Sequence, residues 1–143
     1  MVFVNVNPLS ILFFLLPGDK ICDIANDYKE NHNHVQSVAD MTEKLRSRGP
    51  DAMGMFVQGR THLGHRRLKI IDLSEKAHQP MVDNVLGLAI VYNGAIYNYQ
   101  ELRRELEKMG YVFFSNGDTE VILKSYHAWK EECVRHFNGM FAF

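Results

Sequence analysis

Residues 86–110 read LGLAIVYNGAIYNYQELRRELEKMG, a stretch in which a strand pattern passes directly into a helix pattern. Its first part, 86–92, is a continuous apolar run with β-branched side chains, which predicts a strand buried on both faces. Asn98, a residue type that caps helices, then precedes apolar residues at helical spacing, and Gly110 ends the pattern. The stretch therefore predicts a domain that mixes strands with helices.

The same signals predict further elements on both sides of this stretch. The predicted helices are 37–47, 118–129 and a short one that includes Val134 and Phe137. The predicted strands are 55–57, 68–73, 111–114 and 140–143. Together these elements suit an α+β fold in which two layered, mainly antiparallel sheets are flanked by helices.

Length and composition exclude several classes of protein. A chain of 143 residues is one domain long, and 46% apolar with 23% charged residues is an ordinary globular composition. A net charge of −1 excludes a strongly basic nucleic-acid binder, so we expect no nucleic-acid partner. Cys22 and Cys133 form no C-x-x-C pair, which is typical of a reducing compartment, and we expect a cytoplasmic protein.

The first 34 residues differ in character from the rest. The apolar run at 9–16, LSILFFLL, is shorter than the roughly twenty residues that cross a bilayer. Lys20, the first basic residue, follows the run instead of preceding it as in a secretory signal. We interpret 1–34 as a divergent segment, either a buried strand or an extension foreign to the domain at 35–143. A membrane or export signal is the alternative, and we expect no membrane partner.

One cluster near the N-terminus contains residue types that bind metals. Cys22, His32 and His34 lie in the polar, turn-rich segment 19–34. Zinc sites use tighter ligand pairs at recognisable spacings, so we expect a solvated loop here and no metal. A thiol or metal-binding module built on these three residues is the less favoured alternative.

Four short segments carry residues that do not serve a core, namely 48–51 (RGPD), 63–68 (LGHRRL), 92–94 (YNG) and 117–120 (GDTE). Each lies at the end of a predicted element, where functional sites are usually placed. Taken singly, each has an ordinary structural interpretation. Asn93-Gly94 is typical of a hairpin turn, Asp118 of a helix cap, and the arginines of a solvated face.

In this order the segments resemble the glutamine amidotransferase (type 2) domain at the front of the asparagine synthetase family. The resemblance covers 35–143 through the blocks SRGPDAMG, LGHRRLKIIDLS, QPM, VYNGAIYNYQELRREL, DTEVIL and NGMFAF. It implies an αββα fold of the N-terminal-nucleophile hydrolase type. It also implies that the domain is cut short after 143, because the family continues with further strands and a synthetase domain. NGAIYN, with Ala95 in place of the family's usual Glu, looks most like the subgroup that amidates N-acetylglutaminylglutamine.

The resemblance also implies a glutamine pocket. Arg67 would bind the substrate α-carboxylate through two parallel hydrogen bonds. The Asn93 side chain and the Gly94 N–H would form the oxyanion hole, and Asp118 would accept from the α-ammonium. Arg48, Asp51 and His65 belong to the same blocks and are interpreted as structural. The remaining pocket-lining residues would be Leu68, Lys69, Ile70, Ile71 and Ala95.

The family's nucleophile is an N-terminal cysteine whose thiolate attacks the glutamine amide while its own α-amine acts as the base. Cys22 is the only cysteine upstream of the blocks, and ICDIA around it resembles the family's MCGIA opening. Its nitrogen is an amide here, so it would act only after cleavage before Cys22 or translation from another start. Asp23 and Asn26 stand where the family has glycines. Cys133 is predicted to lie buried on an apolar helix face and to be inert.

Two functions are left open. The first is the glutaminase half of an amidotransferase, which hydrolyses glutamine to glutamate and supplies ammonia to an ATP-dependent amide synthetase. The second is a truncated remnant without catalysis that binds at most glutamine or a partner. We expect no cofactor in this domain, since ATP and Mg²⁺ would serve the absent synthetase domain. The acceptor substrate and the oligomeric state are not predicted.

Overall fold

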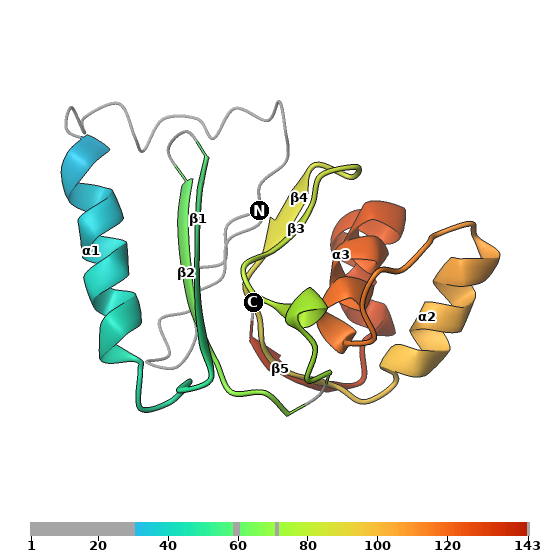
Figure 1. Ribbon diagram of the computed structural model, residues 1–143. Coiled ribbons are helices and arrows are strands. Elements are labelled where there is room, and N and C mark those ends of the chain that lie inside the picture. The colour runs from blue at the N-terminus through green and yellow to red at the C-terminus, as the bar shows by residue number, and fades with distance from the viewer. Residues whose placement is uncertain (1–30, 59–60, 71, 143) are drawn as a thin grey trace.

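The computed structural model describes residues 31–58, 61–70 and 72–142. The helices are α1 (Asn31–Lys44), α2 (Tyr99–Lys108) and α3 (Asp118–Trp129), with 3-10 turns η1 (Glu75–Ala77) and η2 (Lys130–His136). The strands are β1 (Ala52–Gln58), β2 (Thr61–Arg67), β3 (Met81–Asp83), β4 (Leu88–Ile90), β5 (Asn93–Ile96) and β6 (Gly139–Ala142). From left to right, Figure 1 shows α1, the β1–β2 pair, the remaining strands, and then α3 and α2. This arrangement of helices around small antiparallel strand pairs confirms the predicted α+β class.

Every sheet in the described part of the chain is a two-stranded antiparallel pair. The pairs β1–β2 and β3–β4 are local hairpins. The pair β5–β6 joins distant segments, with Asn93 opposite Ala142 and Ile96 opposite Gly139. Asn93-Gly94 therefore opens a strand, and the alternative interpretation of this pair as a hairpin turn is wrong. The chain folds back over α2, α3 and η2 before β6 returns to pair with β5 (Figure 1).

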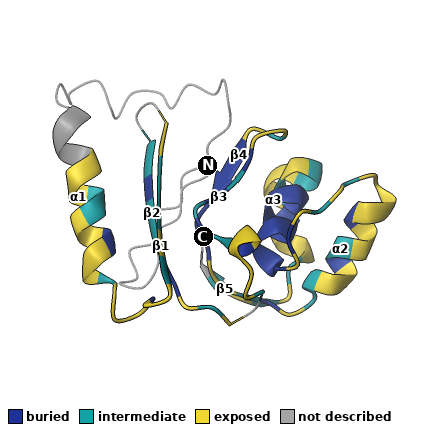
Figure 2. Cartoon of the chain, viewed as in Figure 1, coloured by how far each residue is buried: buried dark blue, intermediate teal, exposed yellow. Residues whose placement is uncertain are grey.

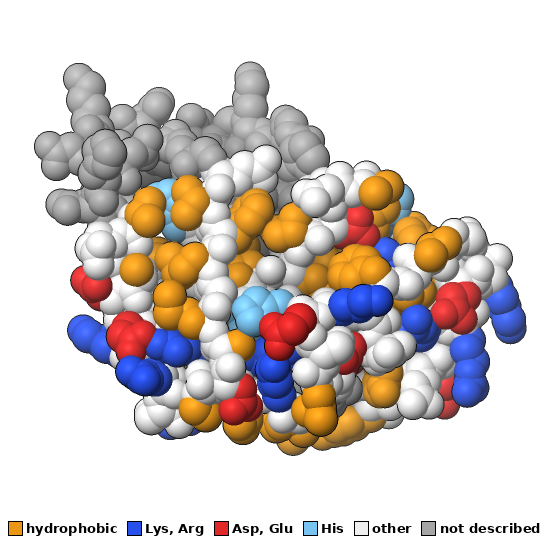
Figure 3. Space-filling model, viewed as in Figure 1, with side chains coloured by type: hydrophobic (Ala, Val, Ile, Leu, Met, Phe, Trp, Pro, Cys, Tyr) orange, Lys and Arg blue, Asp and Glu red, His pale blue; other side chains and the backbone are white. Residues whose placement is uncertain are grey.

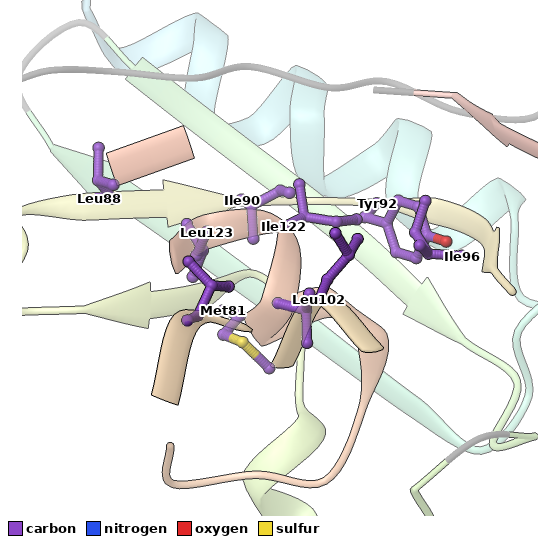
Figure 4. Packing of buried hydrophobic residues seen from close by; sticks show 10 residues of the cluster. Met81, Leu88, Ile90, Tyr92, Ile96, Leu102, Ile122 and Leu123 are labelled. Atoms are coloured by element: carbon purple, nitrogen blue, oxygen red, sulfur yellow. The ribbon is translucent and has the colours of Figure 1, made fainter. Parts of the chain in front are cut away.

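The prediction of a strand within 86–92 that is buried on both faces is confirmed. β4 occupies its centre, and all three of its residues are buried. Side chains at 88, 90 and 92 pack with Met81 and with apolar residues of α2 and α3, as Figure 4 shows. Ala89 and Val91 point the other way and pack with Leu63 of β2 and Phe56 of β1. Because successive side chains of a strand point to opposite faces, β4 packs against α2 and α3 on one face and against the β1–β2 pair on the other.

The two C-terminal helices differ in how far they are buried, as Figure 2 shows. α2 follows Asn98 as predicted, buries Leu102 and Leu106, and exposes most of its charged residues. Gly110 ends the segment with a φ of 96°, a conformation that favours glycine. α3 begins at Asp118 as predicted, and its residues 118–125 are all buried. α3 is thus the central helix of this half of the molecule.

α1 begins earlier than the sequence predicts. The helix covers Asn31–Lys44, so the solvated loop expected at 19–34 is wrong for its last four residues. Thr42 is buried where α1 meets β2: a Cβ added at Gly64 of β2 would lie 2.0 Å from the Thr42 hydroxyl oxygen. Arg66 on β2 donates through Nε to the Thr42 carbonyl at 3.3 Å and pairs with Glu43. The helix is thereby fixed to the outer face of the β1–β2 pair.

Two predicted strands are not strands. The chain after β2 is irregular at 68–70, 72 and 73, because side chains form hydrogen bonds with its main-chain groups. Asp51 accepts the Lys69 N–H at 2.8 Å, and the Arg67 guanidinium donates to the carbonyl of Asp72. The segment 111–114 is also irregular, since the Phe114 N–H donates to a side-chain carboxylate and not to a neighbouring strand. Alternating apolar residues alone did not distinguish these segments from strands.

The last predicted helix and strand are confirmed with small changes. Val134 lies in η2, a 3-10 helix that ends at His136, and Phe137 caps it. The final strand begins at Gly139, one residue before the prediction. Among the described helices, none is both long enough and apolar enough to cross a membrane. On the face shown in Figure 3, acidic and basic side chains lie among hydrophobic ones, in keeping with a net charge of −1.

Candidate functional site

Three of the four sequence segments that carry non-core residues meet where β2, β5 and α3 begin or end. The Asn116 N–H donates to Asp72 Oδ2 at 2.8 Å, which joins the loop after β2 to the start of α3. The Tyr92 hydroxyl donates to Asp118 Oδ2 at 2.8 Å, which joins the strand region of β4 and β5 to the same helix start. The sequence segments 63–68, 92–94 and 117–120 are therefore parts of one region.

Arg67 lies at the end of β2 and is 7% exposed. Its guanidinium donates from one nitrogen to the Ser74 carbonyl at 3.0 Å and from another to the Asp72 carbonyl. No carboxylate of the described residues forms an ion pair with it. Asp72 and Glu75 interact with this charge only beyond ion-pair distance, so the buried guanidinium can bind a negatively charged ligand.

Asp118 is the first residue of α3 and is 4% exposed. Within the described part of the chain, two hydrogen bonds reach its Oδ2, from the Tyr92 hydroxyl at 2.8 Å and from the Ile96 N–H at 3.0 Å. Among the described residues, neither an arginine, a lysine nor a histidine pairs with this carboxylate. Its place in the first turn of a helix favours the negative charge, which is available to a cationic ligand group.

The Asn93-Gly94 pair lies at the exposed start of β5. A Cβ added at Gly94 would lie 2.4 Å from the Met140 carbonyl oxygen and 2.6 Å from the Phe141 Cα. Such distances exclude any side chain, so the close approach of β6 requires glycine at this position. Asn93 and the Gly94 N–H are thus presented at an exposed strand end that the opposite strand holds in register.

The other predicted lining residues lie on the irregular segment after β2. Leu68 and Ile70 are exposed, and Lys69 pairs with Glu75 at 2.6 Å. Ile71 lies outside the described residues. Ala95 is half-buried in β5. Nothing in these contacts tests a role in binding glutamine, so the assignment of these residues remains a prediction.

His65 lies beside the site and stays neutral near pH 7. Burial lowers its pKa to about 4, although a main-chain hydrogen bond with Tyr92 opposes the shift and the Arg67 charge adds to it. No hydrogen-bond partner for its buried Nδ1 lies among the described residues, whereas the buried Nδ1 of His78 lies 3.5 Å from Glu75 Oε2. Arg48 and Asp51 lie at the turn before β1, where Asp51 holds the Lys69 N–H. These contacts agree with the structural roles that the sequence suggests for Asp51.

A supporting network lies behind the site, and sequence reasoning missed it. Gln79 accepts the Tyr92 N–H through Oε1 at 2.6 Å and donates to Thr119 Oγ1 at 3.5 Å. Glu120, fully buried, accepts the N–H of Ser115 at 2.6 Å and that of Phe114 at 2.9 Å. The only sequence signal was the presence of Gln79 and Glu120 in the QPM and DTEVIL blocks. This network holds the chain that leads into Asp118.

The structure describes only one of the two cysteines. Cys22 lies outside the described residues, so its assignment as nucleophile remains a prediction. Cys133 is buried in η2, and burial raises its thiol pKa to about 11, which agrees with the prediction of an inert thiol. In the part of the chain that is described, no group of three His, Cys, Asp or Glu residues could hold a metal ion. The proposed cluster of Cys22 with two histidines is not tested, because Cys22 is not described.

Comparison with known proteins defines the class of this chain. A family model described as a glutamine amidotransferase domain matches residues 21–143, a range that includes Cys22 and all predicted pocket residues. The chain is 43% identical over 110 residues to asparagine synthetase [glutamine-hydrolyzing] 3 of Bacillus subtilis (strain 168). It is 42% identical over 126 residues to a putative asparagine synthetase [glutamine-hydrolyzing] 2 of Methanocaldococcus jannaschii. The chain therefore belongs to the glutamine amidotransferase domains of the asparagine synthetase family.

These matches cover most of the chain but a small part of each relative. Each covers 76% of the chain, which corresponds to 18% of the Bacillus protein and 24% of the Methanocaldococcus protein. Asparagine synthetase [glutamine-hydrolyzing] 1 of Bacillus subtilis (strain 168) is 44% identical over 106 residues, 74% of this chain and 17% of its own length. The chain thus spans less than a quarter of these relatives. The predicted N-acetylglutaminylglutamine subgroup is not tested by these names.

Proposed function

We propose that this chain binds glutamine and forms the glutaminase part of an amidotransferase. The observation that carries the proposal is a pair of buried, opposite charges that lack ionic partners among the described residues, Arg67 and Asp118. A free amino acid carries the complementary pair, an α-carboxylate and an α-ammonium. Each would compensate one buried charge of the protein.

The chemistry of the two groups suits this ligand. A guanidinium presents parallel N–H donors that match a carboxylate in two places, which an ammonium cannot do. A carboxylate with one oxygen free of donors can accept from a primary ammonium. The amide end of the ligand would then lie toward the exposed Asn93-Gly94 pair.

Hydrolysis would proceed in two steps if Cys22 is the first residue. Its thiolate would attack the side-chain amide carbon, and the Asn93 amide with the Gly94 N–H would stabilise the oxyanion of the tetrahedral intermediate. Ammonia would leave with a proton from the Cys22 α-amine, whose pKa lies near 8 when free. Water would then cleave the thioester and release glutamate. An ATP-dependent synthetase domain would use the ammonia, and ATP and Mg²⁺ would bind there.

Glutamine binding without hydrolysis is the second candidate. In a chain that keeps residues 1–21, the Cys22 nitrogen is an amide and cannot act as the base. Asp23 and Asn26 would also place side chains where the family has glycines. Such a chain would retain Arg67 and Asp118, and with them the affinity for glutamine.

Isothermal titration calorimetry with three ligands tests the binding proposal. Glutamine carries both charges, glutaric acid monoamide lacks the ammonium, and γ-aminobutyramide lacks the carboxylate. We expect Arg67→Lys to weaken glutamine binding by about 2–4 kcal/mol, and Asp118→Asn by a similar amount. Asp118→Asn should leave binding of the monoamide unchanged, and Arg67→Lys should leave binding of γ-aminobutyramide unchanged. Arg135→Lys, at an exposed position, is the control.

Equal glutamine affinity in the parent chain and both variants would show that the two residues do not form the pocket. A parent chain that binds no glutamine would refute the proposal itself. Ammonia release, measured for the full chain and for a chain that begins at Cys22, then separates hydrolysis from binding alone. Release only from the second chain, abolished by Cys22→Ala, would establish the nucleophile.

A further inference from the structure

The Tyr92 hydroxyl is the one side-chain donor, among the described residues, that reaches the Asp118 carboxylate. We propose that Tyr92 is a positioning residue that holds Asp118 for the ligand's α-ammonium and so selects free α-amino acids over ligands without that group. The inference rests on the proposed glutamine site. Neither the pocket predicted from the sequence nor the oxyanion hole includes Tyr92.

The hydrogen bonds to Asp118 are distributed unequally between its two oxygens. The Tyr92 hydroxyl, at 2.8 Å, and the Ile96 N–H, at 3.0 Å, both donate to Oδ2. Two donors occupy the two lone pairs of that oxygen. Among the described residues, no donor reaches Oδ1. Tyr92 and Ile96 therefore fix one oxygen and leave the other for an incoming donor.

The Tyr92 ring is itself held firmly. It is 4% exposed and packs in the apolar cluster with Ile90, Ile96 and Leu102 (Figure 4). Its main-chain N–H donates to Gln79 Oε1 at 2.6 Å. A rigid donor fixes the rotation of the carboxylate more tightly than a mobile side chain or a water molecule would.

The neutrality of the tyrosine hydroxyl matters for this role. Burial raises the pKa of Tyr92 above its ordinary value, and the Asp118 charge raises it further, so the hydroxyl stays protonated and keeps donating. A lysine or arginine in its place would also orient the carboxylate, but it would neutralise the charge that attracts the ammonium. A phenol orients Asp118 and leaves its negative charge for the ligand.

A purely structural role would also explain a bond between Tyr92 and Asp118, since it joins β4 and β5 to α3. The two roles differ in what they predict for ligands. If the bond only supports the fold, its loss weakens all ligands of the site equally. If it positions Asp118, its loss weakens only ligands that carry an α-ammonium.

The test is calorimetry of Tyr92→Phe in the full chain with glutamine and with glutaric acid monoamide. We expect about tenfold weaker glutamine binding, the size of one lost hydrogen bond to a charged group, and unchanged binding of the monoamide. In the Asp118→Asn background, Tyr92→Phe should cause no further loss. Tyr97→Phe is the matched control, because Tyr97 is 59% exposed and near in sequence, and it should bind both ligands as the parent chain does.

Each other outcome overturns the inference. Unchanged glutamine affinity, or an equal loss for both ligands, would show that Tyr92 does not position Asp118. Loss of a cooperative melt in Tyr92→Phe would assign the hydroxyl to the fold instead. These results leave glutamine binding by the parent chain intact, whereas a parent chain that binds no glutamine would overturn the proposed function and the positioning role together.

Discussion

Replacement of Lys124 by methionine should destabilise the protein strongly, because it would leave two buried carboxylates without a counter-ion. Lys124 Nζ lies 2.9 Å from Asp83 Oδ2 and 3.2 Å from Glu120 Oε1. The three side chains are 5%, 8% and 0% exposed, respectively. Removal of one partner from a buried pair costs about 3–5 kcal/mol, a large share of the roughly 5–15 kcal/mol that stabilises a domain.

Urea denaturation near pH 7, followed by circular dichroism, would measure this loss. Arg135→Met is the control, since its pair with Glu132 is 78% and 63% exposed, and it should cost at most about 1 kcal/mol. A double variant, Asp83→Asn with Lys124→Met, should recover part of the loss, because one uncompensated charge is then removed. Equal stability of Lys124→Met and Arg135→Met would refute the assignment of this buried network as a stabilising one.

The loss of stability in Lys124→Met should also depend on pH. Burial disfavours the Asp83 charge, but the Lys124 ammonium and the N–H groups of Leu86 and Val85 outweigh it, so its pKa lies below the usual value. A carboxyl with a lowered folded-state pKa stabilises the protein above its unfolded pKa of about 4, and this stability is lost as the pH falls through the folded value. The difference between parent chain and Lys124→Met should therefore be largest near pH 7 and shrink below about pH 4.

Two further predictions concern His65 and Cys133. The folded-state pKa of His65 is lowered to about 4, so the unfolded chain binds its proton first, and the free energy of unfolding should fall by about 3 kcal/mol between about pH 6.5 and pH 4. His65→Gln should flatten this slope in urea titrations, and an unchanged slope would contradict the assignment. The pKa of Cys133 is raised to about 11, so alkylation at Cys133, mapped by mass spectrometry, should be far slower in the folded chain than in urea. Equal rates in the two states would show that Cys133 is accessible.

The elements that the sequence predicted well are those whose signals are local. α2 has its start at Asn98, its apolar face and its terminal Gly110 within a dozen or so residues, and all three appear as expected. The buried strand around β4 is likewise marked by its own composition. Such elements can be predicted without information about their distant contacts.

The elements that were missed depend on distant contacts. β2 reads THLGHRR, a polar sequence with a glycine, and it is a strand because β1 pairs with it along its whole length. The apolar segment that follows looked more like a strand, but Arg67 and Asp51 hold its main chain in an irregular path. In both cases tertiary contacts outweigh local propensity.

The residues of the candidate site likewise include some that the sequence predicts and one that only the fold reveals. Arg67 and Asp118 could be singled out because charged residues stand in blocks that resemble a known family, and the structure then places both in buried positions. The contribution of Tyr92 could not be predicted, since nothing in its sequence neighbourhood indicates that its hydroxyl reaches α3. A residue that acts through another becomes visible only once the fold brings the two together.

The pairing of β5 with β6 has a consequence for the order in which the protein can be made. Asn93 and Gly94 leave the ribosome well before their partners Ala142 and Phe141, with two helices synthesised in between. Chains emerge at about 5–20 residues per second, so these two residues wait some seconds as an unpaired strand edge. Arg67 and its hairpin can already be folded during that interval. Residues 139–142 thus complete the pairing of the strand that carries the proposed oxyanion hole, and a nascent chain has no finished pocket before they emerge.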